Sequence, residues 1–349
     1  VTNEVAPTPE TPTNGEPTVL SFNTEFTNSA QINTYFKNLG YANFADWFNK
    51  TQGFKDAFAK RGTNPDLSIS NTAAWEKTWN TISLMYGKST CNLIEFLTLN
   101  TAILAETNGK FTSVAESVNS ISDSSNPGIS SAFFTYNSSS MNETAYDLFN
   151  NVDYKEAHGH KPYGDKLKDT KDTRWETEDF PLGFDGVDNI KREVSSNVAE
   201  NGFITEADFF KFRARGYIQL FGRINYKKLV EYILSYSGDN SNINSYKQKW
   251  SQYSSNTDKI LTISTNADWD DLFNNTNSII TGQAVFIQAD AKSKYQIIDG
   301  TQGEEAMKKS VRNVGMKVSG NSKPYTDLYE SRVYQQIDWL EKNPPKPST

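Results

Sequence analysis

The sequence contains little cysteine and histidine and has no long apolar run. Cys91 is the only cysteine in 349 residues, so an intrachain disulfide is excluded; its apolar surroundings in an expected helix predict a buried, unreactive thiol. His158 and His160 are the only histidines, and a zinc site would need Glu156 or Asp165 as further ligands. Two histidines in a charged loop are more typical of plain surface, so we expect no metal. No run of about 18 apolar residues occurs, so no transmembrane helix is predicted.

The acidic balance of the chain excludes further classes of function. The formal net charge is -7 and the isoelectric point is about 5.1, whereas a nucleic-acid-binding protein needs a basic surface. The sequence also lacks a phosphate-binding loop, a dinucleotide-binding fingerprint and the nucleophile elbow of serine hydrolases. We therefore expect no nucleic acid partner and no organic cofactor, and nothing supports a catalytic triad.

Both ends of the chain have the composition of linkers. Residues 1–19 combine Pro, Thr and Glu without apolar periodicity, and residues 343–349 are rich in proline. Two interpretations stay open: a module between linkers of a larger polypeptide, or ordinary frayed termini. The first residue is Val and no secretory leader pattern follows it, so we expect a processed product or a segment of something longer.

Apolar residues between these tails recur at helical spacing. The expected helices lie within residues 20–70, over Trp75–Tyr86 with Gly87 after its end, over 93–104 before the Asn108-Gly109 turn, from Tyr226 to Ile233, and from Tyr325 to Leu340. The region 119–145, rich in Ser and Asn, predicts loop, and 153–193 predicts an irregular connection. The sequence thus predicts a mainly α protein with minor strand content.

The most informative segment is Phe212–Tyr226, with the sequence FRARGYIQLFGRINY. It contains too many polar side chains for a plain core segment, and it predicts a short apolar strand followed by a helix with Asn225 as its N-cap. The segment closely resembles the GRGxIQLTGRxNY signature of family 19 glycoside hydrolases, which include plant-type chitinases and phage and bacterial endolysins. The resemblance implies a lysozyme-like α+β fold, with two helical lobes, a small β element and a substrate cleft for amino-sugar polymers.

Glu106 is the candidate general acid. Glycoside hydrolysis needs one carboxylic acid to protonate the leaving oxygen and one carboxylate to activate water or attack directly. Glu106 follows the apolar residues Ile103 and Leu104 at the end of an expected helix, where a pocket wall would desolvate it and the helix dipole disfavours an anion. The alternative is a solvated glutamate at a helix end.

The segment Phe96–Ser117 resembles the endolysin pattern FLAQIAHESGGFxxxxEN. That resemblance implies that Glu106 is the general acid and that Glu116 is the second carboxylate, with one residue more between them than usual. The other interpretation of Glu116 is an ordinary exposed glutamate in a turn. The absence of disulfides favours the phage and bacterial branch over the secreted plant chitinases.

The resemblance also implies contacts to the sugar chain. These fall on Arg215, Gln219 and Asn225 of the signature, and on Ser319 in the segment Val318–Asn321, which resembles the family's INGG sequence.

Four positions depart from the family pattern. Ala105 stands in place of a histidine, Ala214 in place of a glycine, Phe221 in place of a hydroxyl residue that positions water, and Ser319 in place of an asparagine. Loss of the water-positioning hydroxyl threatens the rate more than the fold, because positioning and proton transfer each contribute orders of magnitude.

We expect four parts: a linker (1–19), an N-terminal helical subregion (20–74), a lysozyme-like hydrolase domain (75–342) and a tail (343–349). The resemblance implies inverting hydrolysis of β-1,4 links in peptidoglycan, or in chitin, without a cofactor, outside the cell or on a virion. The alternative is a catalytically degenerate relative that serves as a structural or glycan-binding part of an assembly. The expected partners are the oligosaccharide and other domains or subunits of that assembly.

Overall fold

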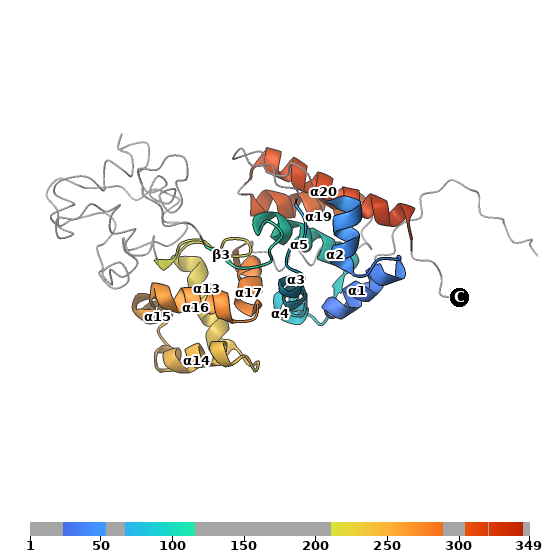
Figure 1. The fold of residues 1–349 in the computed structure, drawn as a ribbon. Helices are drawn as coiled ribbons and strands as arrows, with labels where there is room; N and C mark the ends of the chain where they lie inside the picture. The colour runs from blue at the N-terminus through green and yellow to red at the C-terminus, as the bar shows by residue number, and fades with distance from the viewer. Residues whose placement is uncertain (1–23, 54–66, 116–210, 289–303, 320, 345–349) are drawn as a thin grey trace, which may run out of the picture.

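The computed structural model describes residues 24–53, 67–115, 211–288, 304–319 and 321–344 (Figure 1). Helices dominate these residues, and the named strands form two short antiparallel pairs, which confirms the mainly α prediction. None of the helices described is long and apolar enough to cross a membrane. The predicted linker and both histidines lie outside the described residues.

The N-terminal elements are short, and three of their helices (α1, α2 and α3) begin at asparagine caps. They are β1 (Glu25–Phe26), α1 (Ser29–Asn38), α2 (Phe44–Trp47), the π-helical turn η1 (Phe48–Gln52), α3 (Thr72–Trp79) and α4 (Ile82–Tyr86). The side chains of Asn28, Asn43 and Asn71 each accept a hydrogen bond from a backbone N–H in the first turn, which satisfies a donor that the helix leaves unpaired. These caps explain why such short helices form.

The single helix expected over Trp75–Tyr86 is two helices. At the break between α3 and α4, the Asn80 side chain accepts hydrogen bonds from both the backbone N–H and the hydroxyl of Ser29. Gly87 ends α4 in the left-handed conformation, at φ +63°, as predicted. The predicted boundary after residue 74 falls inside α3, so this helix belongs to both of the parts that we expected on either side of it.

Helix α5 (Leu93–Glu106) lies at the centre of the first hydrophobic core. All of its residues except the last are buried, as expected for a helix that is apolar on every side. Its start is a capping box, in which Asn92 and Glu95 each accept a hydrogen bond from the other's backbone N–H. Cys91 lies in strand β2 (Cys91–Asn92), which pairs with β1, and not in the helix as expected; it is buried, and burial raises the pKa of its thiol.

The remaining helices form two groups, visible in yellow to orange and in red in Figure 1. The first group is α13 (Arg223–Ser235), α14 (Ser241–Trp250), the 3-10 turn η4 (Ser251–Tyr253), α15 (Thr257–Ile263), α16 (Asn266–Asn275) and α17 (Ile279–Gln288). The second is α19 (Glu304–Val318) and α20 (Lys323–Lys342), which pack on each other and on α5.

Two hydrophobic core clusters result. The first cluster is built from α1 to α5 with α19 and α20, and the second from α13 to α17. Helix α17 joins them, since Ile280 and Ala284 belong to the second cluster and Val285 and Phe286 to the first. The signature segment also contributes to both clusters, Tyr217 and Ile218 to the first and Phe212 and Leu220 to the second.

Candidate functional site

Two distant segments meet in a short antiparallel pair of strands. Strand β3 (Val114–Ala115) follows α5, and β4 (Arg215–Gly216) belongs to the signature segment; Val114 pairs with Gly216. The Gly216 backbone has φ +105°, and a Cβ there would lie 3.2 Å from a ring carbon of Phe273, so glycine fits best. The structure therefore brings together the two segments on which the family resemblance is based.

The signature segment is a tight hairpin and not the apolar strand that we expected. Arg215 and Leu220 exchange backbone hydrogen bonds of 3.1 and 2.7 Å, and residues 217–219 form the turn between them. The following helix begins at Arg223 with Gly222 as its N-cap, so the prediction that Asn225 caps this helix is wrong. Asn225 lies in the first turn, and its side-chain N–H donates to the carbonyl of Phe221 at 2.7 Å.

Glu106 is the last residue of α5 and is half-buried. The Tyr325 hydroxyl, near the start of α20, donates a hydrogen bond of 2.8 Å to Oε1 of Glu106. Two further hydrogen bonds hold α20 against α5. In the first, the Tyr329 hydroxyl donates to the Thr98 carbonyl at 2.8 Å. The Gln336 amide donates to the Thr101 hydroxyl, also at 2.8 Å. The position of the Glu106 carboxyl is thus coupled to the packing of the last helix.

The turn after Glu106 leaves room only for glycine at one position. Asn108 and Gly109 have φ values of +52° and +73°, which confirms that they close the helix. A Cβ on Gly109 would lie 1.8 Å from the Ser68 carbonyl oxygen, and the Gly109 carbonyl accepts a 3.1 Å bond from the Ser70 backbone N–H. The end of α5 therefore lies directly against the 68–70 segment.

Arg215, which the family resemblance places in contact with the sugar chain, is buried. Its side chain is only 1% exposed and forms a 2.8 Å salt bridge from Nε to Asp270. The same guanidinium donates to the carbonyl of Lys211, the hydroxyl of Tyr226 and the side-chain oxygen of Asn266. These bonds give Arg215 a structural role, and its predicted contact to the sugar chain stays a prediction.

Of the other predicted site residues, the structure describes Gln219, Asn225 and Ser319 but not Glu116. Gln219 is half-buried in the hairpin turn. The Ser319 hydroxyl accepts a 3.0 Å bond from the Ser322 backbone N–H and shapes the turn between α19 and α20. Glu116 lies outside the described residues, so its distance from Glu106 stays a prediction. The sugar contacts of Gln219, Asn225 and Ser319 likewise stay predictions.

Sequence reasoning missed Tyr325 as a site residue. Its only signal is its place in the apolar pattern of the last helix, which does not distinguish a core tyrosine from one that binds a carboxylate. Arg332 lies on the same face of α20, two turns further on; it is buried, and burial lowers the pKa of its guanidinium to about 10 while Tyr325 acts in the opposite direction.

Among the described residues no cluster of His, Cys, Asp or Glu could hold a metal ion. Comparison with models of protein families, with curated proteins and with solved structures finds no match to this chain.

Proposed function

We propose that the protein is a lysozyme-like glycoside hydrolase that cleaves β-1,4 links between N-acetylated amino sugars. The observation that supports this proposal is that the two segments resembling the family pair through β3 and β4, while the last helix contacts Glu106 at the end of α5. Residues 96–115 provide Glu106, the signature segment pairs with β3, and α20 provides the Tyr325 hydroxyl. The segment 96–115 and the signature segment each resemble the family independently of the other, and a common site is what a shared function requires.

In the proposed mechanism Glu106 protonates the leaving glycosidic oxygen. The Tyr325 hydroxyl donates a hydrogen bond to its Oε1, which orients the carboxyl group. Glu116 would activate water on the opposite face of the sugar, which gives inversion at the anomeric carbon. An inverting pair needs a separation of about 6.5–9.5 Å between the two carboxyl groups. No metal or organic cofactor takes part.

Peptidoglycan is the favoured polymer, and chitin is second. The resemblance runs closer to endolysins than to plant chitinases, and the single buried Cys91 leaves the chain without an intrachain disulfide. A wall-degrading role would take place outside the cell or on a virion, within a larger polypeptide or assembly.

The second candidate is a glycan-binding or structural relative without activity. The observation that favours it is Phe221, half-buried just before α13, where active relatives have a hydroxyl that positions the attacking water. Its carbonyl accepts the amide of Asn225, so one amide expected to bind sugar is used inside the protein. The two candidate functions share a fold and a ligand class, and they differ in whether the bound glycan is hydrolysed.

Loss of turbidity of purified cell walls separates the two candidates. The hydrolase proposal expects wild type to clear the suspension and Glu106→Gln to lose at least about 100-fold in rate, the usual contribution of a general acid. Glu231→Gln, at an exposed glutamate of α13, is the matched control and should keep full activity. Co-sedimentation with walls by both wild type and Glu106→Gln, without clearing by either, would establish the binding role instead.

A further inference from the structure

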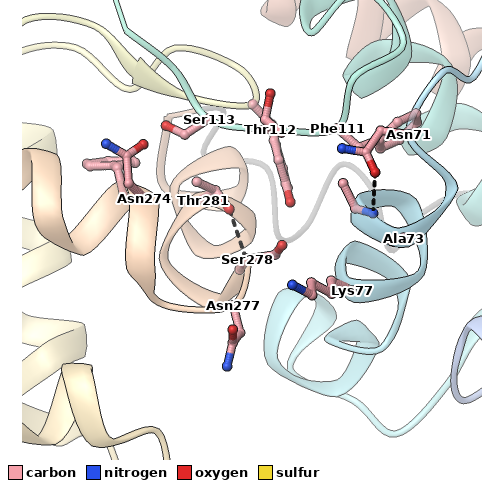
Figure 2. Close-up of a pocket in the computed structure, with 13 residues that line it drawn as sticks. Asn71, Ala73, Lys77, Phe111, Thr112, Ser113, Asn274, Asn277, Ser278 and Thr281 are labelled. Atoms are coloured by element: carbon pink, nitrogen blue, oxygen red, sulfur yellow. Dashed lines mark hydrogen bonds between the residues drawn. The ribbon is translucent and has the colours of Figure 1, made fainter.

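A pocket of about 460 Å³ lies between α3 and the α16–α17 turn (Figure 2). The rings of Phe111, Tyr217 and Phe273 in its wall are at most 3% exposed, so they present no open face to a ligand. Among the described residues that line it, Lys77 is the only charged one and none carries a sulfur atom. The reactive side chain that the proposed mechanism leaves unused lies outside this pocket: it is Met316, in the last turn of α19.

Met316 is the methionine that solvent reaches among those that the structure describes. Met85 and Met307 are 1% and 5% exposed, whereas Met316 is half-buried. The fourth methionine, Met141, lies outside the described residues. Because peroxide oxidises the thioethers that it can reach, Met316 is the described methionine most open to oxidation.

The sulfur of Met316 contacts the first turn of α20. It accepts a hydrogen bond of 3.1 Å from the Thr326 hydroxyl, which also lies 2.8 Å from the Ser322 carbonyl oxygen. The Met316 backbone carbonyl accepts the Asn321 N–H at 2.7 Å, and Asn321 has φ +68°. Met316 therefore connects the end of α19 with both the following turn and the start of α20.

The two helices are closely packed beside this contact. A Cβ on Gly315 would lie 2.6 Å from a ring carbon of Tyr329 and 3.2 Å from the methyl carbon of Thr326. Thr326 is 0% exposed, so its hydroxyl depends on partners within the protein. A chemical change at the sulfur is therefore passed on to α20 and is not absorbed by solvent.

The start of α20 also contacts the proposed general acid. Tyr325 immediately precedes Thr326, and its hydroxyl donates the 2.8 Å hydrogen bond to Glu106. A displacement of this turn would move the Tyr325 hydroxyl away from the Glu106 carboxyl.

We propose that Met316 is a site of oxidation by hydrogen peroxide, and that its sulfoxide loosens the first turn of α20. A sulfur lone pair attacks one peroxide oxygen and the O–O bond breaks. The hydroxide that leaves takes the proton of the transferred oxygen and departs as water, so the sulfur loses two electrons and the peroxide gains them. The sulfoxide sulfur carries a partial positive charge and no longer accepts the Thr326 proton, and the new S–O group makes an apolar side chain polar.

The contact with Thr326 also predicts the stereochemistry of the product. One lone pair of the sulfur faces the Thr326 hydroxyl, in space that the packed helices fill, so the oxygen adds to the other lone pair. One of the two sulfoxide epimers should then predominate. Each class of methionine sulfoxide reductase reduces one epimer, so one class alone should restore the protein.

The test treats the full chain with hydrogen peroxide and follows each methionine by mass spectrometry of its peptides. We expect Met316 to be oxidised at least about tenfold faster than Met85 and Met307, because a buried sulfur reacts only after local opening. The midpoint of thermal unfolding should fall by at least about 2 °C. Met316→Leu is the matched control, and peroxide should leave its midpoint unchanged. Since this variant retains Met141, the difference between the two proteins reports Met316 alone.

Thr326→Val tests the stereochemistry, because it removes the hydroxyl and keeps a methyl group against Gly315. Oxygen should then add to both lone pairs, so that full repair needs both reductase classes. Oxidation of Met316 no faster than that of the two buried methionines would overturn the proposal. An unchanged midpoint after its oxidation, or an equal mixture of epimers in wild type, would also overturn it.

These measurements do not depend on the proposed function, whereas the effect on Glu106 rests on it. If the protein hydrolyses walls, peroxide should slow wild type and leave Met316→Leu at its initial rate. Equal slowing of both proteins would overturn the link from Met316 to Glu106. A wild type that hydrolyses no wall, but is oxidised at Met316 and loses stability, leaves the modification site in place and removes only the hydrolase.

Discussion

The Tyr325 hydroxyl and the Glu106 carboxyl are joined by a 2.8 Å hydrogen bond across 219 residues of sequence. Glu106 ends the central helix of the first core cluster, and Tyr325 opens the last helix. This contact gives the proposed acid a fixed orientation that its own helix does not provide, since it lies at the helix end. It also makes any activity of Glu106 dependent on the docking of α20.

Replacing Tyr325 by Phe tests that dependence. The variant removes the hydrogen bond that orients Oε1 of Glu106, and because loss of positioning commonly costs orders of magnitude, the hydrolysis rate should fall about tenfold or more. Tyr334→Phe on the same helix is the control, because its hydroxyl donates to the Lys308 carbonyl and it lies about 13 Å further along the helix axis. Initial rates on cell walls measure both. Equal rates for wild type and Tyr325→Phe would show that the contact has no role in catalysis.

Arg215→Lys should damage stability more than ligand binding. The lysine would lose the planar set of bonds to Asp270, Tyr226 and Asn266, and would leave buried partners unsatisfied. We expect the free energy of unfolding in urea to fall by about 3 kcal/mol. A loss below about 1 kcal/mol together with weaker sugar binding would contradict the structural role and favour the substrate contact.

Gly109→Ala and Gly40→Ala form a matched pair for the turn after Glu106. Both glycines have positive φ, but a Cβ at Gly109 would lie 1.8 Å from the Ser68 carbonyl oxygen, whereas nothing lies within 4 Å of one at Gly40. Gly40→Ala should cost about 1–2 kcal/mol for its backbone alone, and Gly109→Ala should cost clearly more. Thermal unfolding of both variants measures the difference. Equal losses would mean that the turn moves freely away from the 68–70 segment.

We predict that the buried carboxyl group of Glu95 makes the free energy of unfolding depend on pH. Its carboxylate is 1% exposed, binds Lys88 at 2.8 Å, and has its pKa raised chiefly by burial. A folded pKa above the unfolded one means that the folded state binds the proton more tightly, so this group's contribution to stability falls as pH rises through that window.

Comparison with Glu95→Gln isolates this group, because Gln keeps an acceptor for the Asn92 N–H but does not titrate. Wild type should become more stable relative to Glu95→Gln as the pH falls from neutral into the acid range. Urea unfolding at a series of pH values measures the difference between the two. A constant difference at all pH values would contradict the raised pKa.

The sequence predicts those parts of the fold that depend on residues close together in the chain, and it does not predict those that depend on residues far apart. The last helix could be predicted from its periodicity, because Tyr329, Val333 and Ile337 are buried one or two turns apart. The break between α3 and α4 could not, because the partner of Asn80 at the break is Ser29, 51 residues away in sequence.

The candidate site shows the same division between local and distant interactions. Glu106 could be found because it ends an apolar helix, which is a local pattern. Its partner Tyr325 is distant in sequence and gives no local signal. The role of Arg215 could not be predicted, because a sequence does not say whether the partners of a polar side chain are protein or ligand; Asp270 is 55 residues away.

The most direct test of the central claim compares two substrates for wild type and Glu106→Gln. One is a wall oligosaccharide, and the other is the same oligosaccharide with dinitrophenolate as its leaving group, which departs without protonation. If Glu106 is the general acid, Glu106→Gln loses at least about 100-fold in rate on the first substrate and far less on the second. An equal loss on both substrates, or no loss on the first, would contradict the assignment of Glu106.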